Sequence, residues 1–364
     1  MKINSTKTFL PLLSNYIKYL NKIWLNNVLT NNGRYLHELE KKLKIFTGTN
    51  NLLVVNNGFS ALSIALSSLK FSNEIITTPF TYIATSSALL WRNCKPIFVD
   101  IDNETFCINP DLIEAKITKN TKGILATHVF GNICNLEKIN TISKKYKMPI
   151  IYDGAHVFGV NLKSGKNLYE YGDATILSFH ATKVFSTVEG GAVIFRNRKL
   201  FEKSKSIRSY GHDGEYNFNA IGINAKLSEL HASFGLAQLK IFKKSIASRK
   251  KVNDLYKKNL IELERSGKIF YQKISESITY NYSYFPVVFQ SEKDLKLILK
   301  LLNEKNIYPK RYFYPSLNTL RIINSKEKCY VSERISKRIL CLPIYTTLSD
   351  SYVNKISKII IKNL

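Results

Sequence analysis

The chain has 364 residues, 45% of them hydrophobic and 12% aromatic, which excludes a disordered chain and predicts one large domain with a smaller one. Its formal net charge is +27, yet the lysines are scattered along the chain, and no helix-turn-helix, zinc-finger or RNA-binding signature accompanies them. We interpret the charge as a solvated basic surface rather than a nucleic-acid footprint, and it is compatible with an anionic substrate.

The cysteines favour a reduced cellular compartment. Cys94, Cys107, Cys134, Cys329 and Cys341 are odd in number, widely spaced and free of any CxxC pair, so neither a metal site nor a disulfide framework is predicted. The N-terminal apolar patch is only five residues long, and no apolar run reaches the length of a transmembrane helix. We therefore expect a soluble cytoplasmic protein without a membrane partner.

Short apolar runs alternate with helical periods from residue 51 onward. The runs that read as buried strands are 51–57, 74–80, 95–102, 121–130, 148–155, 173–180 and 190–196. Helical periods begin at residues 58, 81 and 136. Strands that are continuously apolar and separated by helices are typical of a mainly parallel sheet with helices on both faces.

The character of the chain changes after Gly235. A long helical period reaches Gly267, a strand follows over 280–290, a helix begins with Ser291 as its N-cap, and a last helix covers 349–363. We predict an α/β protein with a large domain over 1–239 and a connector helix plus smaller α/β domain over 240–364. The N-terminal segment is left free to pack on the smaller domain.

Four sets of polar residues follow predicted strands. They are the Asn57-Gly58-Phe59-Ser60 turn that opens a helix, Tyr82, Asp153, and Ser178 with Lys183. In an open α/β sheet ligands bind beyond the carboxyl ends of the strands, and a helix start binds anions. A phosphate-binding helix start, a stacking ring, a carboxylate for a pyridine nitrogen and a lysine for a Schiff base are what pyridoxal 5'-phosphate requires. Taken singly, each residue is equally typical of a turn, a core position or the surface.

The order of these motifs resembles the DegT/StrS-type sugar-nucleotide aminotransferases of the aspartate-aminotransferase fold (fold type I). The resemblance runs nearly end to end, through NNGFSALSIAL, TPFTYIAT, THVFGN, YDGAHVFGV, SFHATKVFSTVEGGA, GINAKLSELHASFGLAQL and KRYFYPSL. It implies a pyridoxal-phosphate-dependent transaminase. Related sugar dehydratases carry His at the lysine position, so Lys183 favours transamination.

The resemblance also implies roles for single residues. Lys183 matches the catalytic Schiff-base lysine, Asp153 the partner of the pyridine nitrogen, and His156 the residue beside the phenolic oxygen. Tyr82 matches the ring-stacking aromatic.

The phosphate cradle is matched by Ser178 and by the backbone of Phe59 and Ser60. Asn224 matches an asparagine that reaches the phosphate from the other subunit, so the resemblance implies a homodimer with shared active sites.

Two positions depart from the family pattern. Asn57-Gly58-Phe59 replaces the common Ser-Gly-Thr, which removes one side-chain hydroxyl that Ser60 is expected to compensate. Asn224-Ala225-Lys226 replaces Asn-Tyr-Arg, which leaves the role of the family's arginine open. Candidate substrate contacts are Lys226, Lys310, Arg311 and Tyr314.

The motif sequences are most similar to those of enzymes that aminate C4 of dTDP-4-keto-6-deoxy-D-glucose with L-glutamate. Such enzymes supply amino sugars for O-antigen, lipopolysaccharide or antibiotics. Two rival enzymes, a C3 aminotransferase and a UDP-sugar aminotransferase, stay open. A rival from another class is a nucleic-acid-binding or regulatory protein that keeps the fold without turnover.

Overall fold

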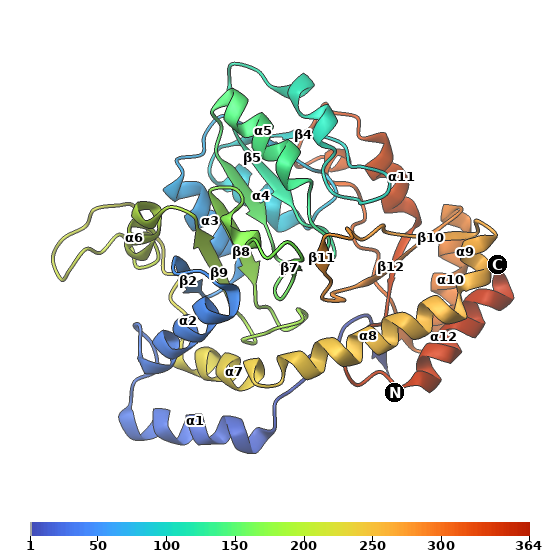
Figure 1. Ribbon diagram of the computed structural model, residues 1–364, viewed down its shortest axis with the longest axis horizontal. Coiled ribbons are helices and arrows are strands. Elements are labelled where there is room, and N and C mark those ends of the chain that lie inside the picture. The colour runs from blue at the N-terminus through green and yellow to red at the C-terminus, as the bar shows by residue number, and fades with distance from the viewer. Residues whose placement is uncertain (1) are drawn as a thin grey trace.

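The computed structural model describes residues 2–364 and is built around a seven-stranded sheet (Figure 1). The strands are β2 (Leu52–Val55), β3 (Glu74–Thr77), β4 (Lys95–Phe98), β5 (Thr121–Thr127), β6 (Ile150–Asp153), β8 (Ala174–Ser178) and β9 (Gly191–Phe195). Their order is β2-β9-β8-β6-β5-β3-β4, and only β9 runs antiparallel to its neighbours. The predicted mainly parallel sheet is confirmed.

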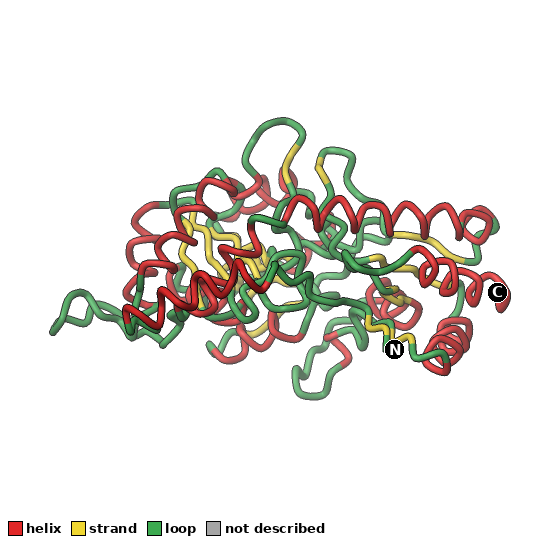
Figure 2. Tube along the Cα trace, turned by 90° about the horizontal axis from the view of Figure 1, so that it is seen from below, coloured by secondary structure: helices red, strands yellow, loops and turns green. Residues whose placement is uncertain are grey.

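Helices cover both faces of this sheet, and alternate strand residues supply the two cores. Leu52 and Val54 pack on the face covered by α2 (Arg34–Thr47), α5 (Leu136–Tyr146) and α7 (Glu229–Leu239). Leu53 and Val55 pack on the opposite face, under α3 (Gly58–Ser68), α4 (Ile83–Trp91) and α6 (Arg198–Ile207). In Figure 2 the strands lie between the helices. Burial on both faces explains why these strands are apolar without alternation.

The C-terminal part forms a second layer with its own core. A three-stranded antiparallel sheet joins β10 (Ile269–Tyr271), β12 (Phe285–Phe289) and β14 (Ile339–Leu342). The helices of this part are α8 (Phe242–Asn259), α9 (Ile261–Arg265), α10 (Glu292–Glu304), α11 (Tyr330–Arg338) and α12 (Asp350–Asn363). Ser291 caps α10 by accepting a hydrogen bond from the Asp294 amide, as its sequence predicts.

The single long helix expected up to Gly267 is wrong. The chain instead forms α7, α8 and α9, which are separated at residues 240–241 and at Leu260 (Figure 1). Ile241 and Leu260 adopt non-helical dihedral angles although neither is a helix-breaking residue. An apolar repeat cannot detect an interruption of one or two residues that carries no Gly or Pro.

Short strand pairings connect the C-terminal part with the N-terminus and with the middle of the chain. β1 (Ile3–Asn4) lies parallel to β13 (Ile307–Tyr308), and β7 (Asn161–Leu162) pairs with β11 (Ile278–Thr279). The N-terminal strand thus contacts the C-terminal layer, while the predicted domain boundary at residue 239 stays a prediction. α1 (Leu13–Asn26) follows, and α1 buries only Ile23. Across residues 2–364, no helix joins enough length to enough apolarity to cross a bilayer.

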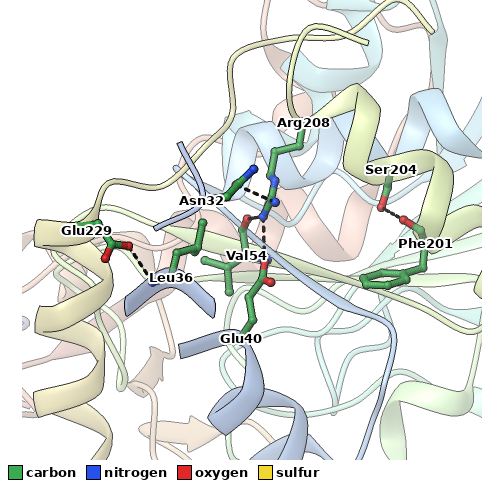
Figure 3. Close-up of polar contacts among 8 residues, drawn as sticks. All are labelled: Asn32, Leu36, Glu40, Val54, Phe201, Ser204, Arg208 and Glu229. Atoms are coloured by element: carbon green, nitrogen blue, oxygen red, sulfur yellow. Dashed lines mark hydrogen bonds and ion pairs between the residues drawn. The ribbon is translucent and has the colours of Figure 1, made fainter. Parts of the chain in front are cut away.

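A buried ion pair fixes the first strand of the sheet to its neighbouring helices (Figure 3). Arg208 Nη1 donates to Glu40 Oε1 at 2.8 Å and to the Val54 carbonyl at 2.9 Å, while Glu40 Oε1 also accepts the Val54 amide. Arg208 Nη2 donates to Asn32 Oδ1 at 2.9 Å. The contacts tie α2, β2 and the end of α6 together.

Glu229 holds the start of α2 in the same region. Its carboxylate accepts the Leu36 amide at 2.9 Å (Figure 3) and the Tyr35 amide at 2.7 Å. These are two of the amides that a helix start leaves without an intrahelical partner. A carboxylate at this position also suits the helix dipole.

We expect Glu40→Ala to lower the free energy of unfolding by about 3–5 kcal/mol, because Arg208 would remain buried without its counter-charge. Urea denaturation measures the change. Glu202→Ala, which removes an exposed carboxylate paired with Lys205, is the control and should leave the free energy unchanged within error. Equal effects of the two substitutions would contradict this account.

Candidate active site

A cavity of about 300 Å³ lies at the carboxyl edge of the large sheet. Its walls include Asn57, Gly58 and Phe59 after β2, Asp153 at the end of β6, Ser178 at the end of β8, and Tyr82, His156 and Lys183. The predicted cofactor residues at the ends of different strands therefore meet in one place. Parallel strands explain this, since their carboxyl ends share one edge.

Lys183 stands on a loop that the backbone holds closed. The Phe179 amide donates to the Gly190 carbonyl at 2.8 Å, and the Thr187 amide donates to the Phe179 carbonyl at 2.9 Å. The hydroxyl of Thr8 donates to the Ala181 carbonyl at 2.6 Å, so the N-terminal segment also fixes this loop. Burial lowers the pKa of Lys183 to about 8, although the Asp153 carboxylate acts in the opposite direction.

Asp153 is buried and accepts two hydrogen bonds. Thr85 Oγ1 donates to its Oδ2 at 2.6 Å, and the Ala155 amide donates to its Oδ1 at 3.1 Å. Burial raises the pKa of Asp153, while the Thr85 hydroxyl, the Ala155 amide and the Lys183 charge act against that rise. Lone pairs remain on this carboxylate for one further donor from the cavity.

His156 is a neutral hydrogen-bond donor in this site. Its Nδ1 accepts the Phe130 amide at 3.2 Å, so the proton of the neutral ring is on Nε2. Burial lowers the pKa of His156 well below its ordinary value, and the charge of Lys183 lowers it further. The ring lies parallel to Phe313, with centroids 6.0 Å apart, and edge-on to Tyr284 at 4.9 Å.

The start of α3 offers an anion site beside Ser178. Asn57 caps the helix by accepting the Ser60 amide at 2.7 Å, and the amides of Gly58 and Phe59 precede the first intrahelical hydrogen bond. A Cβ atom at Gly58 would lie only 3.2 Å from the Ser178 Cβ. The close approach of Gly58 to Ser178 forms a cradle that suits a phosphate group.

The Ser60 amide is not available in the way the sequence predicted. It is already donated to Asn57 Oδ1, and Ser60 is buried outside the cavity lining, which leaves the amides of Gly58 and Phe59 for an anion. The Asn57 cap therefore occupies one of the two amides that the resemblance assigned to the phosphate.

Asn224 and Lys226 lie outside this cavity within the chain. Asn224 is exposed, pairs with Ser209 in an isolated bridge, and accepts a hydrogen bond at its carbonyl from Asn56 Nδ2 at 3.2 Å. The Lys226 amine lies 5.2 Å from the ring centroid of Tyr210.

The predicted substrate contacts of the C-terminal part are also outside the cavity lining. Lys310 is exposed and pairs with Cys341 through the backbone. Arg311 Nη2 donates to Glu292 at 3.3 Å and to the Lys337 carbonyl at 3.0 Å, and its guanidinium lies 3.5 Å from the Tyr314 ring centroid. Their roles as substrate contacts stay predictions.

Several residues that line the cavity were not predicted from the sequence. They are Thr81, Thr85, Thr127, His180, Thr182, Glu189, Tyr284, Tyr312 and Phe313. Thr81, Thr85 and Thr182 carry a usable signal, because they lie within three residues of Tyr82 or Lys183 in the chain. Tyr284, Tyr312 and Phe313 come from the C-terminal part, and no local pattern places them here.

The donor set fits pyridoxal 5'-phosphate. The site combines a glycine-lined anion cradle, a tyrosine ring, a buried carboxylate, a neutral histidine donor and a lysine amine with a lowered pKa. A metal is not required by this set, and residues 2–364 hold no group of His, Cys, Asp and Glu side chains arranged for one. Fold and site together define a pyridoxal-phosphate-dependent aminotransferase.

The comparisons with known proteins agree with this class. The chain belongs to the DegT/DnrJ/EryC1/StrS aminotransferase family, whose model matches residues 13–361. Two similar relatives are named dTDP-4-amino-4,6-dideoxy-D-glucose transaminase. The one from Shigella dysenteriae is 39% identical over 96% of both chains, and the one from Escherichia coli is 37% identical over 98% of this chain and 97% of its own. NtdA from Bacillus subtilis, solved with bound cofactor PMP, superposes with a TM-score of 0.88 at 26% identity, over 96% of this chain and 82% of its own.

We expect cofactor-free protein to form a borohydride-reducible link to pyridoxal phosphate through Lys183. The rate of formation should rise with pH through about 8, because only the unprotonated amine attacks and burial lowers its pKa to about 8. Visible absorbance and peptide mapping after reduction measure it.

The control for this experiment is an exposed lysine on the same sheet. Lys122→Ala should keep the link and its pH profile, whereas Lys183→Ala should lose both. A reducible link that survives in Lys183→Ala would remove the assignment.

Proposed function

We propose that the protein converts dTDP-4-keto-6-deoxy-D-glucose to dTDP-4-amino-4,6-dideoxy-D-glucose, with L-glutamate as the amino donor. The single observation that supports this substrate is the near full-length similarity, at 39% and 37% identity, to two transaminases that carry this product in their names. The geometry supports the reaction class independently of the sugar.

In this proposal the predicted residues hold the cofactor along its length. The amides of Gly58 and Phe59 and the Ser178 hydroxyl bind the phosphate, and Tyr82 covers one face of the ring. The Asp153 carboxylate accepts a hydrogen bond from the protonated ring nitrogen. The Thr85 hydroxyl and the Ala155 amide hold the carboxylate in position and leave lone pairs free for this bond.

His156 completes the set as a donor to the phenolic oxygen. Its Nε2 proton is set by the hydrogen bond that Nδ1 accepts from Phe130, so the ring cannot present an acceptor there without losing that bond. The carbonyl of His156 accepts from Asn281 Nδ2 and Ser283 Oγ, both at 2.8 Å, which fixes the backbone of the residue.

Lys183 moves the proton in the chemical step. An amine with a pKa of about 8 exists in both protonation states near neutral pH, so it can take a proton from the amino carbon and return one on the neighbouring atom. When bound, pyridoxal phosphate supplies the electron-withdrawing ring that accepts the electron pair left behind. Asp153 supports that role by keeping the ring nitrogen protonated.

Aromatic side chains from the C-terminal part exclude water on the side of His156. Tyr284 and Phe313 are buried against this ring, and Tyr312 lies edge-on to Tyr284 with centroids 5.6 Å apart. At the same cavity, His180 Nε2 lies 3.5 Å from Glu189 Oε1, and both side chains remain accessible to solvent. The sugar nucleotide therefore has an accessible polar route to a largely apolar interior.

The decisive experiment incubates the protein with L-glutamate and each of three keto-sugar nucleotides, linked to dTDP, GDP or UDP. NMR of the product shows whether an amine forms and at C4 or C3. We expect amination at C4 of the dTDP sugar, and none with Lys183→Ala. Preferred turnover of a UDP sugar, or amination at C3, would contradict the proposal.

A non-catalytic nucleic-acid-binding role is the rival from another class. It would give a DNA affinity that falls steeply with salt, no cofactor absorbance and no product with any sugar. The rival does not account for a lysine with a lowered pKa in one cavity with Asp153, His156 and the start of α3, because DNA binding needs no such group.

We further propose that the protein acts as a homodimer in the cytoplasm. Apolar side chains that a monomer exposes support the dimer: Leu13, Trp24 and Leu25 on α1, and Tyr216, Phe218 and Ile221 in the segment before Asn224. Large exposed apolar side chains in such number favour a protein interface. Five free, buried cysteines suit a reducing compartment.

In this dimer Asn224 reaches the phosphate of the neighbouring chain. We expect a mixture of inactive Lys183→Ala and inactive Asn224→Ala subunits to regain activity, because one site of each heterodimer collects both defects and the other collects none. Activity after subunit exchange measures this, with each homodimer assayed separately as a control. Proven heterodimers without activity would mean that Asn224 does not serve the neighbouring site.

A further inference from the structure

Three buried threonine hydroxyls form a line that ends on Asp153. Thr127 Oγ1 donates to Thr81 Oγ1 at 3.2 Å, Thr81 and Thr85 hydroxyls lie 2.9 Å apart, and Thr85 Oγ1 donates to Asp153 Oδ2 at 2.6 Å. The three side chains come from the end of β5, the loop after β3 and the first turn of α4. All three line the cavity that holds Lys183.

The protons in this line can point in only one direction. An ionised carboxylate can only accept hydrogen bonds, so the Thr85 hydroxyl must donate its one proton to Asp153. Thr81 must then donate to Thr85, and Thr127 donates to Thr81. Each hydroxyl accepts one bond and donates the next, an arrangement in which neighbouring bonds strengthen one another.

The hydrogen bond from Thr85 to Asp153 is hard to replace because both side chains are buried. Thr81, Thr85 and Thr127 are at most 3% exposed, and Asp153 is 5% exposed, so bulk water does not replace a lost donor easily. Because burial by itself raises the pKa of Asp153, the Thr85 hydroxyl is the first of the groups that keep this carboxylate ionised.

We propose that Thr85 is a positioning residue for the transaminase reaction, which orients Asp153 and keeps it ionised, with Thr81 and Thr127 as its supporting hydroxyls. Thr85 acts through Asp153 and itself needs no contact with the reacting atoms. The inference depends on the aminotransferase class and not on the identity of the sugar.

The charge of Asp153 decides where a shared proton stays. Without the Thr85 donor, Asp153 binds a proton more tightly, and the proton shared with the ring nitrogen of the cofactor moves toward the carboxylate. A less positive ring is a weaker electron sink, so the chemical step slows. A less positive ring also repels a proton on the Lys183 nitrogen more weakly. The Lys183 nitrogen should therefore keep its proton to higher pH.

Other titratable groups lie around Asp153, and the experiment leaves all of them unchanged. Lys183 faces Asp153 from the loop after β8, and its charge is the one that lowers the pKa of the carboxyl group. His156 follows on the turn after β6, Tyr82 precedes α4, and Tyr284 lies on the C-terminal side of the cavity. Burial raises the pKa of the Cys134 thiol, and the charge of Asp153 acts in the same direction. None of these side chains is changed in the experiment.

The experiment compares Thr85→Val, which keeps the shape and removes the hydroxyl, with Thr85→Ser, which keeps the hydroxyl. Thr77→Val is the matched control. Thr77 is fully buried on strand β3, which pairs with β5, and its hydroxyl has no hydrogen-bond partner among residues 2–364. Each variant is prepared with bound cofactor. The readouts are the pH at which the cofactor's visible absorbance changes, measured without substrate, and kcat and KM separately.

We expect Thr85→Val to move the absorbance transition to higher pH by about one unit and to lower kcat about ten- to hundredfold with little change in KM. Thr85→Ser should restore kcat to within about threefold of the parent, and Thr77→Val should match the parent in both readouts. Thr81→Val should give a smaller shift in the same direction, and it keeps the proposal testable if Thr85→Val does not fold.

An unchanged absorbance transition in a folded Thr85→Val or Thr81→Val holoenzyme overturns the proposal, as does a loss of kcat that Thr85→Ser does not restore. Because the absorbance is measured without any sugar, this failure is distinct from failure of the proposed substrate. Parent protein that shows no cofactor absorbance would instead remove the aminotransferase assignment.

Discussion

Burial of two opposite charges in one cavity is the constraint on which the chemistry depends. Removal from water raises the pKa of Asp153 and lowers that of Lys183, so burial brings both groups nearer to neutral pH than they would be at the surface. Each charge partly offsets the shift of the other. The Thr85 hydroxyl, the Ala155 amide and the Lys183 charge act against the rise in the pKa of Asp153, and the Lys183 amine has a pKa of about 8, which suits proton transfer on an amino carbon.

Hydrogen bonds connect the elements that surround this pair. The Arg208–Glu40 pair connects the end of α6 with α2 and β2, and Glu229 at the start of α7 caps α2 (Figure 3). β2 leads directly into the anion cradle at Gly58. The lysine loop is closed by its own backbone bonds and by Thr8. A site assembled from separate strand ends keeps its geometry because each end is tied to its neighbours.

The C-terminal part contributes shape rather than proton chemistry to the cavity. Tyr284, Tyr312 and Phe313 close one side with aromatic rings, and Phe313 lies parallel to His156. The N-terminal strand β1 pairs with β13 in this same part, and Thr8, four residues after β1, contacts the lysine loop. The two layers are therefore linked next to the Lys183 loop, so a shift of one layer would move the loop of the other.

The sequence by itself determined the sheet, the strand ends and most of the candidate cofactor residues that line the cavity, because apolar runs indicate burial and a parallel sheet gathers its carboxyl ends at one edge. Lys183, Asp153, His156 and Tyr82 were readable from their places after strands and from the family resemblance. Only the tertiary structure decided that Thr85 reaches Asp153 from 68 positions away in the chain, and that Tyr284 and Phe313 line the cavity. The reason is physical: hydrogen bonds and ring contacts between distant segments depend on how the elements pack, and no periodicity within one segment carries that information.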